Sequence, residues 1–310
     1  MNMTERHLRM FTTTAALGNI SRASEQLHVS QPALTRALQE FESQLGVKLF
    51  ARTTRRLALT HEGERFMPVA QRLLADMQQA ALELREQSTG MRGTVSIAVG
   101  TAFGCTILPA VLRRFTASHP HVRVHLVDDN SAGITNRVSR AEVDLGIGSP
   151  VGETHHLRCQ KLLDAPIGLL CDPGAFALKA SVTDKQLASL PLLKEPADTS
   201  IAHLLRAHGS ALVPHMERGI EVSSLALQLA LASAGVGVAV LSALGASHPQ
   251  AASLRFTPLR ARIVREVFLL TRPDRPLSPS CRALVQTLSN VMASAELKLH
   301  PGVRFAPLDL

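Results

Sequence analysis

The segment from Ser21 to Gly46 constrains the fold more than any other part of the chain, because it carries start and stop signals for two short helices. Ser21 is a candidate N-cap for the first helix and Ser30 for the second. Pro32 falls in the first turn of the second helix, where its missing N–H breaks no hydrogen bond. Gly46 can adopt the left-handed conformation that ends a helix. The segment therefore predicts two helices joined by a tight connection.

The second of these helices has one apolar face and one polar face. Its apolar residues recur at helical spacing and predict a buried stripe: Leu34, Ala37, Leu38, Phe41 and Leu45. The opposite face then presents Gln31, Ala33, Thr35, Arg36 and Gln39. In the major groove of DNA, glutamine can pair with adenine and arginine with guanine, so this face suits a recognition helix. For an amphipathic helix taken alone, a solvated polar surface is the alternative interpretation.

The residues after Gly46 favour DNA binding over that alternative. Two short apolar stretches, 47–50 and 57–60, flank a basic turn that contains Arg52, Thr53, Arg55 and Arg56. Such a hairpin is typical of a wing, whose cations contact phosphates or enter the minor groove. The formal net charge of +8 also fits a polyanionic partner, although solubility alone explains such a value equally well.

Residues 61–89 carry one long helical pattern. The apolar positions step by four and three residues and form a continuous seam: Phe66, Ala70, Leu73, Met77, Ala80 and Leu84. A helix of this length extends roughly 43 Å. Because a lone helix cannot bury such a seam, we expect a helix–helix contact between two subunits. Packing of the seam on the helix's own domain is the alternative.

From Thr94 onward, strand patterns alternate with helical patterns. Val95, Ile97 and Val99 alternate at period two, a helical pattern follows over 107–115, and period two returns over 122–126. This is a βαβ unit. The alternation continues with strands expected at 143–147, 167–170, 220–222, 236–241 and 267–270, and with helices expected around 134–138, 201–205, 225–234 and 280–292. The second part of the chain is thus predicted to be an α/β domain.

Several classes of protein are disfavoured by the sequence. The longest apolar stretch, 225–241, is interrupted by polar residues and glycines, and the N-terminus lacks the apolar core of a signal peptide, so we expect a cytoplasmic protein without a membrane span. The four cysteines, Cys105, Cys159, Cys171 and Cys281, lack metal-ligand spacing and are expected to be reduced thiols. No metal site or other cofactor is predicted.

Motifs of common enzyme classes are missing as well. The sequence contains no G-x-S-x-G elbow, no phosphate-binding G-x-x-x-x-G-K-[ST] loop and no H-E-x-x-H pair. Gly235 and Gly237 follow a helical pattern, so they indicate the end of a helix rather than a nucleotide loop. We therefore expect no catalytic residues, although a two-lobed α/β enzyme remains an alternative.

Residues 23–38, together with 45–50, Arg52, 59–60 and Gly63, resemble the N-terminal signature of LysR-type transcriptional regulators. The departures are small: Ser24 stands where the family usually has alanine, Thr35 where it commonly has serine, and His61 near a frequent alanine. The resemblance implies a winged helix-turn-helix over 1–60, a linker and dimerisation helix over 61–90, and an effector-binding domain over 91–310. It extends DNA contact to Ser30, Gln31, Pro32, Ala33, Thr35, Arg36, Arg52 and Thr53, to which the residue patterns above add Gln39, Arg55 and Arg56.

The resemblance also implies a fold for residues 91–310 and a mode of assembly. The fold is like that of periplasmic binding proteins, with lobe I at about 94–165 and 271–292 and lobe II at about 166–270. Paired linker helices would run antiparallel, two dimers would form a homotetramer, and the partners would be double-stranded promoter DNA and, as a further candidate, RNA polymerase. A transport-type binding protein shares the two lobes, but it would be exported and would need no basic winged domain.

In such a fold, ligands bind where strands end and helices begin. The positions expected there are Thr101, Ala102, Phe103, Asn130, Ser131, Gly148, Ser149, Thr199, Ser200, Ser223 and Ser224. Each hydroxyl taken singly is explained equally well as a helix cap. Because free N–H groups at helix N-termini favour anions, we expect a small organic anion as effector. A thiol redox sensor of the same fold is the alternative, since Cys105 is expected at a helix start near this cleft, where a thiolate would be stabilised.

Overall fold

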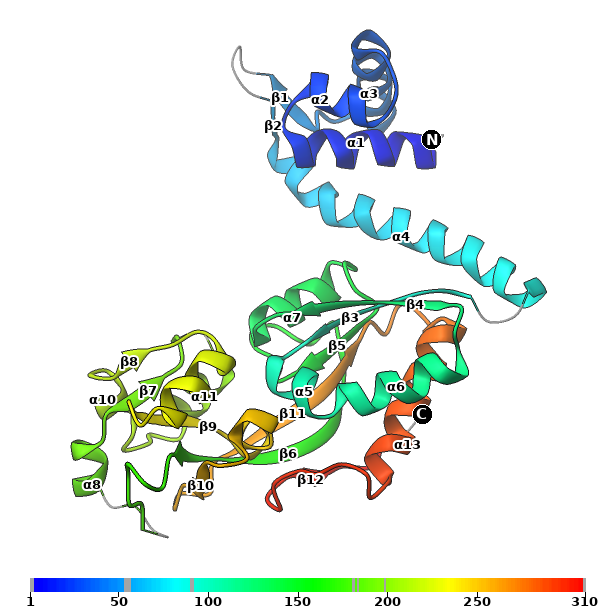
Figure 1. Ribbon diagram of the computed structural model, residues 1–310. Coiled ribbons are helices and arrows are strands. Elements are labelled where there is room, and N and C mark those ends of the chain that lie inside the picture. Colours follow the sequence, from blue (N-terminus) through cyan, green and yellow to red (C-terminus); the bar gives the residue numbers. More distant parts are fainter. Residues whose placement is uncertain are drawn as a thin grey trace. The chain divides into compact units, whose positions relative to one another are not determined.

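The computed structural model describes residues 3–52, 57–89, 92–179, 182, 184–197 and 199–308. The chain divides into two compact units, consisting essentially of residues 1–90 and 91–310, and each is described by itself. Figure 1 shows their helices and strands. Arg52 is described only in its backbone, and Thr53, Arg55 and Arg56 lie outside the described residues.

The first unit is a winged helix-turn-helix followed by a long helix, as predicted. Helices α1 (Glu5–Leu17), α2 (Ile20–Gln26) and α3 (Gln31–Leu45) precede an antiparallel pair of short strands, β1 (Phe50–Arg52) and β2 (Leu57–Leu59), and α4 (His61–Thr89) ends the unit. The Ser30 side chain accepts a hydrogen bond from the Ala33 N–H, and Gly46 ends α3 in the left-handed conformation with φ 72°. The prediction for α2 was wrong in one respect. Its cap is Asn19, which accepts from the Arg22 N–H, so Ser21 lies inside the first turn.

Aromatic rings hold the first unit together. Phe11 lies 5.5 Å from Phe50 and 5.4 Å from Phe66, and Phe41 lies 5.9 Å from Phe66, measured between ring centroids. These contacts join α1, α3, β1 and the start of α4 in one core, with the predicted stripe of α3 turned inward. Edge-on and tilted ring pairs of this kind add to the burial of apolar area.

The seam of α4 is divided between two roles. Ala70 is fully buried in the core of the first unit, and Phe66 and Leu73 pack against the same core. The expectation that the whole seam faces another subunit was therefore wrong for its first half, because α1 and α3 already cover it. Met77 is 47% exposed. The side chains of Ala80 and Leu84 lie outside the described residues.

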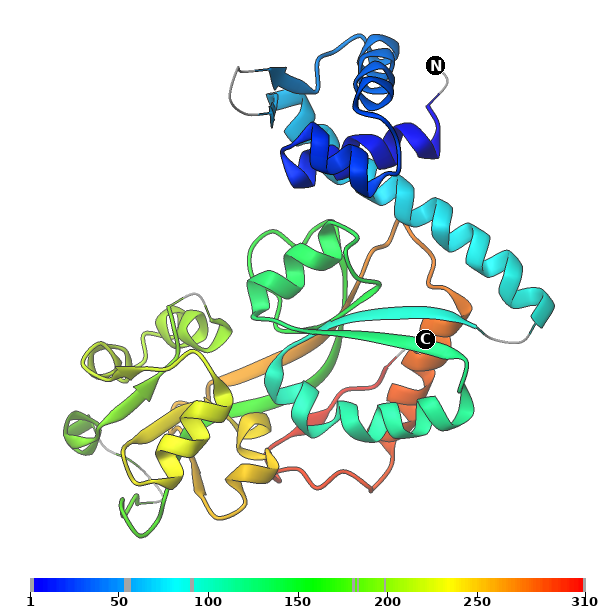
Figure 2. The same cartoon turned by 45° about the horizontal axis from the view of Figure 1, so that its top comes forward.

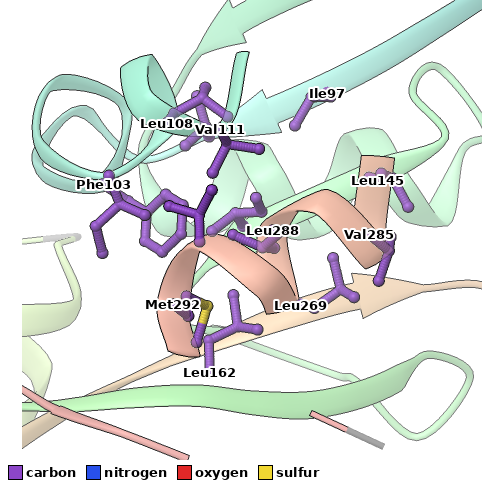
Figure 3. Close-up of a cluster of buried hydrophobic side chains, with 14 of the residues drawn as sticks. Ile97, Phe103, Leu108, Val111, Leu145, Leu162, Leu269, Val285, Leu288 and Met292 are labelled. Atoms are coloured by element: carbon purple, nitrogen blue, oxygen red, sulfur yellow. The ribbon is translucent and has the colours of Figure 1, made fainter. Parts of the chain in front are cut away.

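The second unit begins with the predicted βαβ unit. β3 (Gly93–Val99) pairs in parallel with β4 (Val122–Asp128) and with β5 (Leu145–Gly148). The connecting helix is divided into α5 (Thr101–Thr106) and α6 (Leu108–Ser118), and α7 (Ser131–Ser139) follows β4. Helix α13 (Pro279–Ala293) returns to this lobe and packs against α6, and Figure 3 shows Val285 and Leu288 of α13 in the same buried cluster as Leu108 and Val111.

Two long antiparallel strands connect the lobes. Figures 1 and 2 show β6 (Arg158–Cys171) and β11 (Val264–Thr271) running side by side, and their pairing extends from Arg158 to Pro166 on β6. Leu162 and Leu163 of β6 belong to the core of the first lobe, whereas Ile167 and Leu169 belong to the core of the second. The first crossing thus falls near Pro166.

The second crossing falls earlier than expected from the sequence. Lobe II was expected to extend to Leu270, but β11 pairs with β5 through residues 268–270 and places Val267 and Leu269 in the core of the first lobe. Ile263 still packs in the second lobe. The chain therefore re-enters lobe I at Val264, because the backbone of the apolar residues 267–270 pairs with β5 and β6.

The second lobe has its own sheet, in which β6 pairs with β9 (Val238–Ser242) and β9 with β7 (Leu192–Lys194). The remaining strands are β8 (Ile220–Glu221) and β10 (Arg255–Pro258). The helices of this lobe are α8 (Asp184–Ser189), α9 (Ser200–Ala207), α10 (Val213–Met216), α11 (Leu225–Ser233), α12 (Ala243–Ala246) and the 3-10 turn at Pro249–Ala251. Several of these elements are too short to give a periodic signal in the sequence.

The residues after α13 add one more strand. β12 (Arg304–Phe305) pairs with β6 at Leu163 and Asp164, and Val303 and Phe305 pack against the core of the first lobe. The His300 ring contacts Phe256 edge-on, with ring centroids 4.8 Å apart. The end of the chain thus lies along β6 close to the first crossing.

Candidate DNA-binding surface and effector pocket

The polar face of α3 is open, as its pattern predicts. Gln31, Pro32, Ala33, Arg36 and Gln39 are exposed, and Thr35 is half-buried. Arg36 donates from Nε to Glu40 Oε1 at 3.1 Å one turn along the helix, and its side chain remains 82% exposed. A pair this exposed restrains the side chain little, so Arg36 is available to a ligand in front of the helix.

A buried carboxylate that the sequence patterns did not single out fixes α3 to the wing. Glu42 accepts hydrogen bonds from the backbone N–H groups of Leu49 (2.9 Å) and Phe50 (3.1 Å) and from Lys48 Nζ (2.9 Å). Burial raises the pKa of Glu42, but these hydrogen bonds, that from Lys48 foremost, outweigh it and hold the pKa below the ordinary value. In the sequence, Glu42 stands next to Phe41 on the apolar face of α3, and a charged residue at such a position could have indicated a buried carboxylate.

The base of the wing is tightly packed on the start of α4. The Thr60 hydroxyl donates to the Lys48 carbonyl and accepts from the Gly63 N–H. A Cβ on Gly63 would lie 2.2 Å from the Leu49 carbonyl oxygen, so no other residue fits there. The short strands β1 and β2 extend from this base toward residues 53–56.

A pocket of about 340 Å³ lies between the two lobes of the second unit. It is lined by the ends of strands and the starts of helices α5, α7, α9 and α11. The lining residues are Gly100, Thr101, Ala102, Asp128, Asp129, Asn130, Ser131, Glu195, Thr199, Ser200, Ile201, Ser223, Leu225, Leu241, Ser242, Gly245 and Arg265. Its volume suits a small molecule.

The pocket contains some of the positions expected from the sequence and excludes others. Those in the lining are Thr101, Ala102, Asn130, Ser131, Thr199, Ser200 and Ser223. Phe103 is not among them, because its side chain is buried in the core of the first lobe, as Figure 3 shows. Gly148 packs against Ile134, and Ser224 caps α11 by accepting from the Leu227 N–H.

Ser149 lies behind the pocket wall. Its hydroxyl donates to the Glu266 carbonyl and accepts from Arg265 Nε at 3.1 Å. Arg265 itself lines the pocket, and its Nη2 lies 3.9 Å from where a Cβ on Gly100 would be. Ser149 thus positions the guanidinium. Neither Arg265 nor Glu195 was expected from the sequence, where each stands beside another charged residue, Glu266 and Lys194.

Glu195 and Arg265 both line the pocket and interact electrostatically. Burial raises the pKa of Glu195, while the charge of Arg265 and a hydrogen-bonding contact with Thr199 lower it in part. Burial lowers the pKa of Arg265, and the charge of Glu195 raises it in part. Each ion therefore stabilises the other in an environment that disfavours charge.

Two aspartates at the end of β4 complete the charged lining. Asp128 accepts from the Thr101 hydroxyl, whose oxygen lies 2.8 Å and 3.1 Å from its two carboxylate oxygens. Asp129 pairs with Arg137 Nε at 2.7 Å and accepts from the Asn130 N–H. Asp129 is thus neutralised within the first lobe, whereas Asp128 is bound only by a hydroxyl among the described residues.

The cysteine environments do not match the redox alternative. Cys105 lies near the end of the six-residue helix α5, and burial together with the charge of Asp128 raises the pKa of its thiol. The expectation of a stabilised thiolate was wrong, because burial and the negative charge of Asp128 both disfavour the thiolate. The structure has all four cysteines as free thiols. In the described ranges, no group of three or more potential metal ligands is found. None of the helices in the described part of the chain is long and apolar enough to cross a membrane.

Comparison with known proteins matches both units to one family. Residues 5–64 match the model described as bacterial regulatory helix-turn-helix protein, lysR family, and residues 88–293 match the LysR substrate binding domain. The uncharacterized HTH-type transcriptional regulator YfeR of Shigella flexneri is 26% identical over 288 residues, which is 92% of each chain. The HTH-type transcriptional regulator CitR of Bacillus subtilis is 29% identical over 188 residues, which is 61% of this chain and 63% of CitR.

Solved structures share the fold of the whole chain. A full-length OxyR variant from Pseudomonas aeruginosa superposes with a TM-score of 0.68 at 22% identity and covers 98% of both chains. Full-length CbnR in complex with its target DNA has a TM-score of 0.65 at 22% identity, covering 93% of this chain and all of CbnR. With both family models matched in order over most of its length, the chain belongs to the LysR family of bacterial transcriptional regulators and is not an enzyme.

Proposed function

We propose that this regulator reads promoter DNA with the exposed face of α3 and the wing, and that a small organic effector with an anionic group binds in the pocket and alters DNA binding. The single observation that carries the effector proposal is Arg265. Among the described residues, it is the one cation in the lining of a pocket whose walls also contain the starts of α7, α9 and α11. A guanidinium beside helix N-termini favours a carboxylate or a similar anion.

The DNA-contacting residues proposed on α3 are Ser30, Gln31, Pro32, Ala33, Thr35, Arg36 and Gln39. Ser30 has a structural role as the cap of α3, and a capping residue next to the helix start also lies where a phosphate binds. Arg52, Thr53, Arg55 and Arg56 of the wing would contact phosphates or the minor groove. Since the DNA of a bacterium is in the cytoplasm, we propose that compartment as the place of action.

Assembly would use the second half of the α4 seam. Met77 is exposed and leaves an apolar position for a partner helix, so a dimer through α4 and a homotetramer of two such dimers are proposed. A contact with RNA polymerase at the promoter is proposed as the route from DNA binding to transcription. The lobe angle would be the bistable element, because a ligand shifts an equilibrium only by binding one state more tightly.

The DNA part of the proposal is tested by selecting fragments from a genomic library with the purified protein and measuring affinity for the enriched sequence. Binding should exceed that of scrambled DNA and should fall steeply as salt rises, because phosphate contacts release counterions. Equal affinity for both sequences would contradict it.

The effector part is tested by thermal-shift measurements with small organic acids, because a ligand of the folded state raises the melting temperature. Arg265→Gln should abolish the shift, whereas Arg123→Gln, at an exposed position on β4, should retain it. An acid that shifts wild type and Arg265→Gln equally would show that the pocket is not its site.

A further inference from the structure

The charges in the pocket do not suit a simple anion. Asp129 is paired with Arg137, whereas Glu195 and Arg265 line the same cavity with opposite formal charges. Asp128 has no cation within ion-pair distance in the part of the chain that the structure describes. An effector bearing only negative charge would bring that charge close to Asp128, and like charges repel.

The hydrogen bond between Thr101 and Asp128 fixes what this wall can offer. Since the Thr101 hydroxyl donates its proton to the Asp128 carboxylate, the threonine oxygen has only lone pairs left. The carboxylate likewise only accepts. The Thr101 hydroxyl and the Asp128 carboxylate thus form a pair of acceptors, which favours a group that donates N–H bonds. The expectation that Thr101 would help to hold a carboxylate is replaced by this geometry.

Arg265 provides hydrogen-bond donors to the pocket. Its Nε is engaged by Ser149, and its terminal amino groups make no hydrogen bond with the described residues, which leaves their N–H groups for a ligand. Nη2 lies near Gly100, which lines the pocket next to Thr101. One cavity thus contains donors for a carboxylate on Arg265 and a pair of acceptors for an ammonium group on Thr101 and Asp128.

Ile201, Leu225 and Leu241 contribute aliphatic side chains to the lining, beside the hydroxyl groups of Ser131, Thr199, Ser200, Ser223 and Ser242. The aliphatic side chains suit an apolar group on the ligand. We propose that the effector is a zwitterion of the amino-acid type, with its carboxylate on Arg265, its ammonium group on Asp128 and Thr101, and an aliphatic or aromatic side chain. This inference rests on the proposed function and specifies its ligand class.

The experiment compares matched probes on the full-length protein. Thermal shift at about 10 mM identifies the tightest binder among valine, leucine, isoleucine, methionine and phenylalanine. Calorimetric titration then compares it with the same molecule lacking the amino group and with the one lacking the carboxylate. For leucine these are 4-methylpentanoate and 3-methylbutylamine. We expect one amino acid to bind and each truncated analogue to bind at least about tenfold more weakly, since each loses a charge-assisted contact.

Variants separate the two ends of the ligand. Asp128→Asn should lower the affinity for the amino acid by at least about tenfold and leave the affinity for the des-amino carboxylate unchanged. Arg265→Gln should lower the affinity for both ligands. Glu153→Gln, an exposed carboxylate outside the pocket, is the matched control and should bind like wild type. Circular dichroism of each variant checks that it is folded.

Two results would overturn the inference. If des-amino carboxylates bind as tightly as the amino acids, the effector is a plain anion, and the proposed function stands without the zwitterion. If none of the amino acids binds while the protein still recognises its selected DNA, the ligand class is wrong although the regulator itself is confirmed.

Discussion

Glu42 is the residue on which the DNA-binding surface most depends without being part of it. Its carboxylate accepts from two consecutive backbone N–H groups at the entry to the wing and from Lys48. Only an ionised carboxylate accepts all three bonds. The relative orientation of α3 and the wing therefore depends on one buried charge.

Glu42→Gln should lower the free energy of unfolding at neutral pH by about 1–3 kcal/mol, because the amide cannot accept all three bonds. The pKa of Glu42 is lowered by folding, so its stabilisation is present above the unfolded-state value of about 4.3 and is lost as pH falls through the folded value. The difference between variant and wild type should therefore shrink below about pH 4. Urea unfolding followed by circular dichroism measures it, since the chain has no Trp or Tyr. Glu40→Gln, in an exposed pair, is the control, and an equal loss there would contradict the account.

The exposed face of α3 gives a second prediction at this scale. Gln31→Ala and Arg36→Ala should each weaken binding to the selected sequence by about 1–3 kcal/mol if the lost side chain reads a base. Binding to scrambled DNA should change little for Gln31→Ala and moderately for Arg36→Ala, which also loses a charge. Fluorescence anisotropy with labelled duplexes measures both. Unchanged affinity in both variants would mean that another surface reads the sequence.

Helix α4 illustrates how one element serves two purposes. Its first turns complete the core of the winged unit through Phe66, Ala70 and Leu73, whereas Met77 is exposed one turn further on. The periodic pattern in the sequence is continuous over both parts, because burial in the same chain and burial against another chain require the same apolar residues. Only the structure shows which apolar residues of α4 are buried in their own unit and which are exposed.

The two halves of α4 should respond differently to charge. Met77→Asp should dissociate the assembly and leave the winged unit as stable as in wild type, because a buried unpaired charge disrupts an apolar interface. Leu73→Asp should instead destabilise the winged unit itself. Sedimentation velocity at micromolar concentration reports the assembly, and thermal melting by circular dichroism reports stability. An unchanged sedimentation coefficient for Met77→Asp would exclude this part of α4 from the interface.

At the level of elements, periodicity predicted most of the fold. The alternation of β3 and β4 and the apolar stripe of α3 repeat often enough to be unambiguous. It predicted the short strand β8 at 220–222, but it could not predict β7 or β12, which have three and two residues. Nor could it predict the crossing at Val264, which depends on pairing with distant strands. Phe103 was misplaced for a similar reason. Its position at a helix start fits a cleft, but its side chain turns into the core.

The candidate pocket was predicted only in part, and the missing part is its charge. Helix starts give local signals, since Ser, Thr and Asn there are recognisable as caps. Glu195 and Arg265 are separated by 70 positions and acquire meaning only when β7 and β11 bring them to one cavity. Electrostatic pairing between distant segments leaves no local pattern. This is why the sequence indicated an anion, whereas the assembled pocket favours a zwitterion.

At the scale of the whole molecule, three parts of the chain have separate proposed functions. The winged unit would bind DNA, α4 would pair subunits, and the two-lobed unit would bind the effector. Coupling between pocket and DNA requires that ligand affinity differ between two conformations, and the same coupling must act in both directions. DNA should therefore change the affinity for the effector by the same factor by which the effector changes the affinity for DNA.

The most direct test of this coupling is the affinity for the selected DNA, measured with and without a saturating effector, in wild type and in Arg265→Gln. A coupling of about 1–3 kcal/mol corresponds to a change of roughly 5- to 150-fold in wild type. We expect such a change in wild type and none in Arg265→Gln, with the same ligand-free affinity for DNA in both proteins. An effector response of Arg265→Gln equal to that of wild type would contradict the claim that this pocket controls DNA binding.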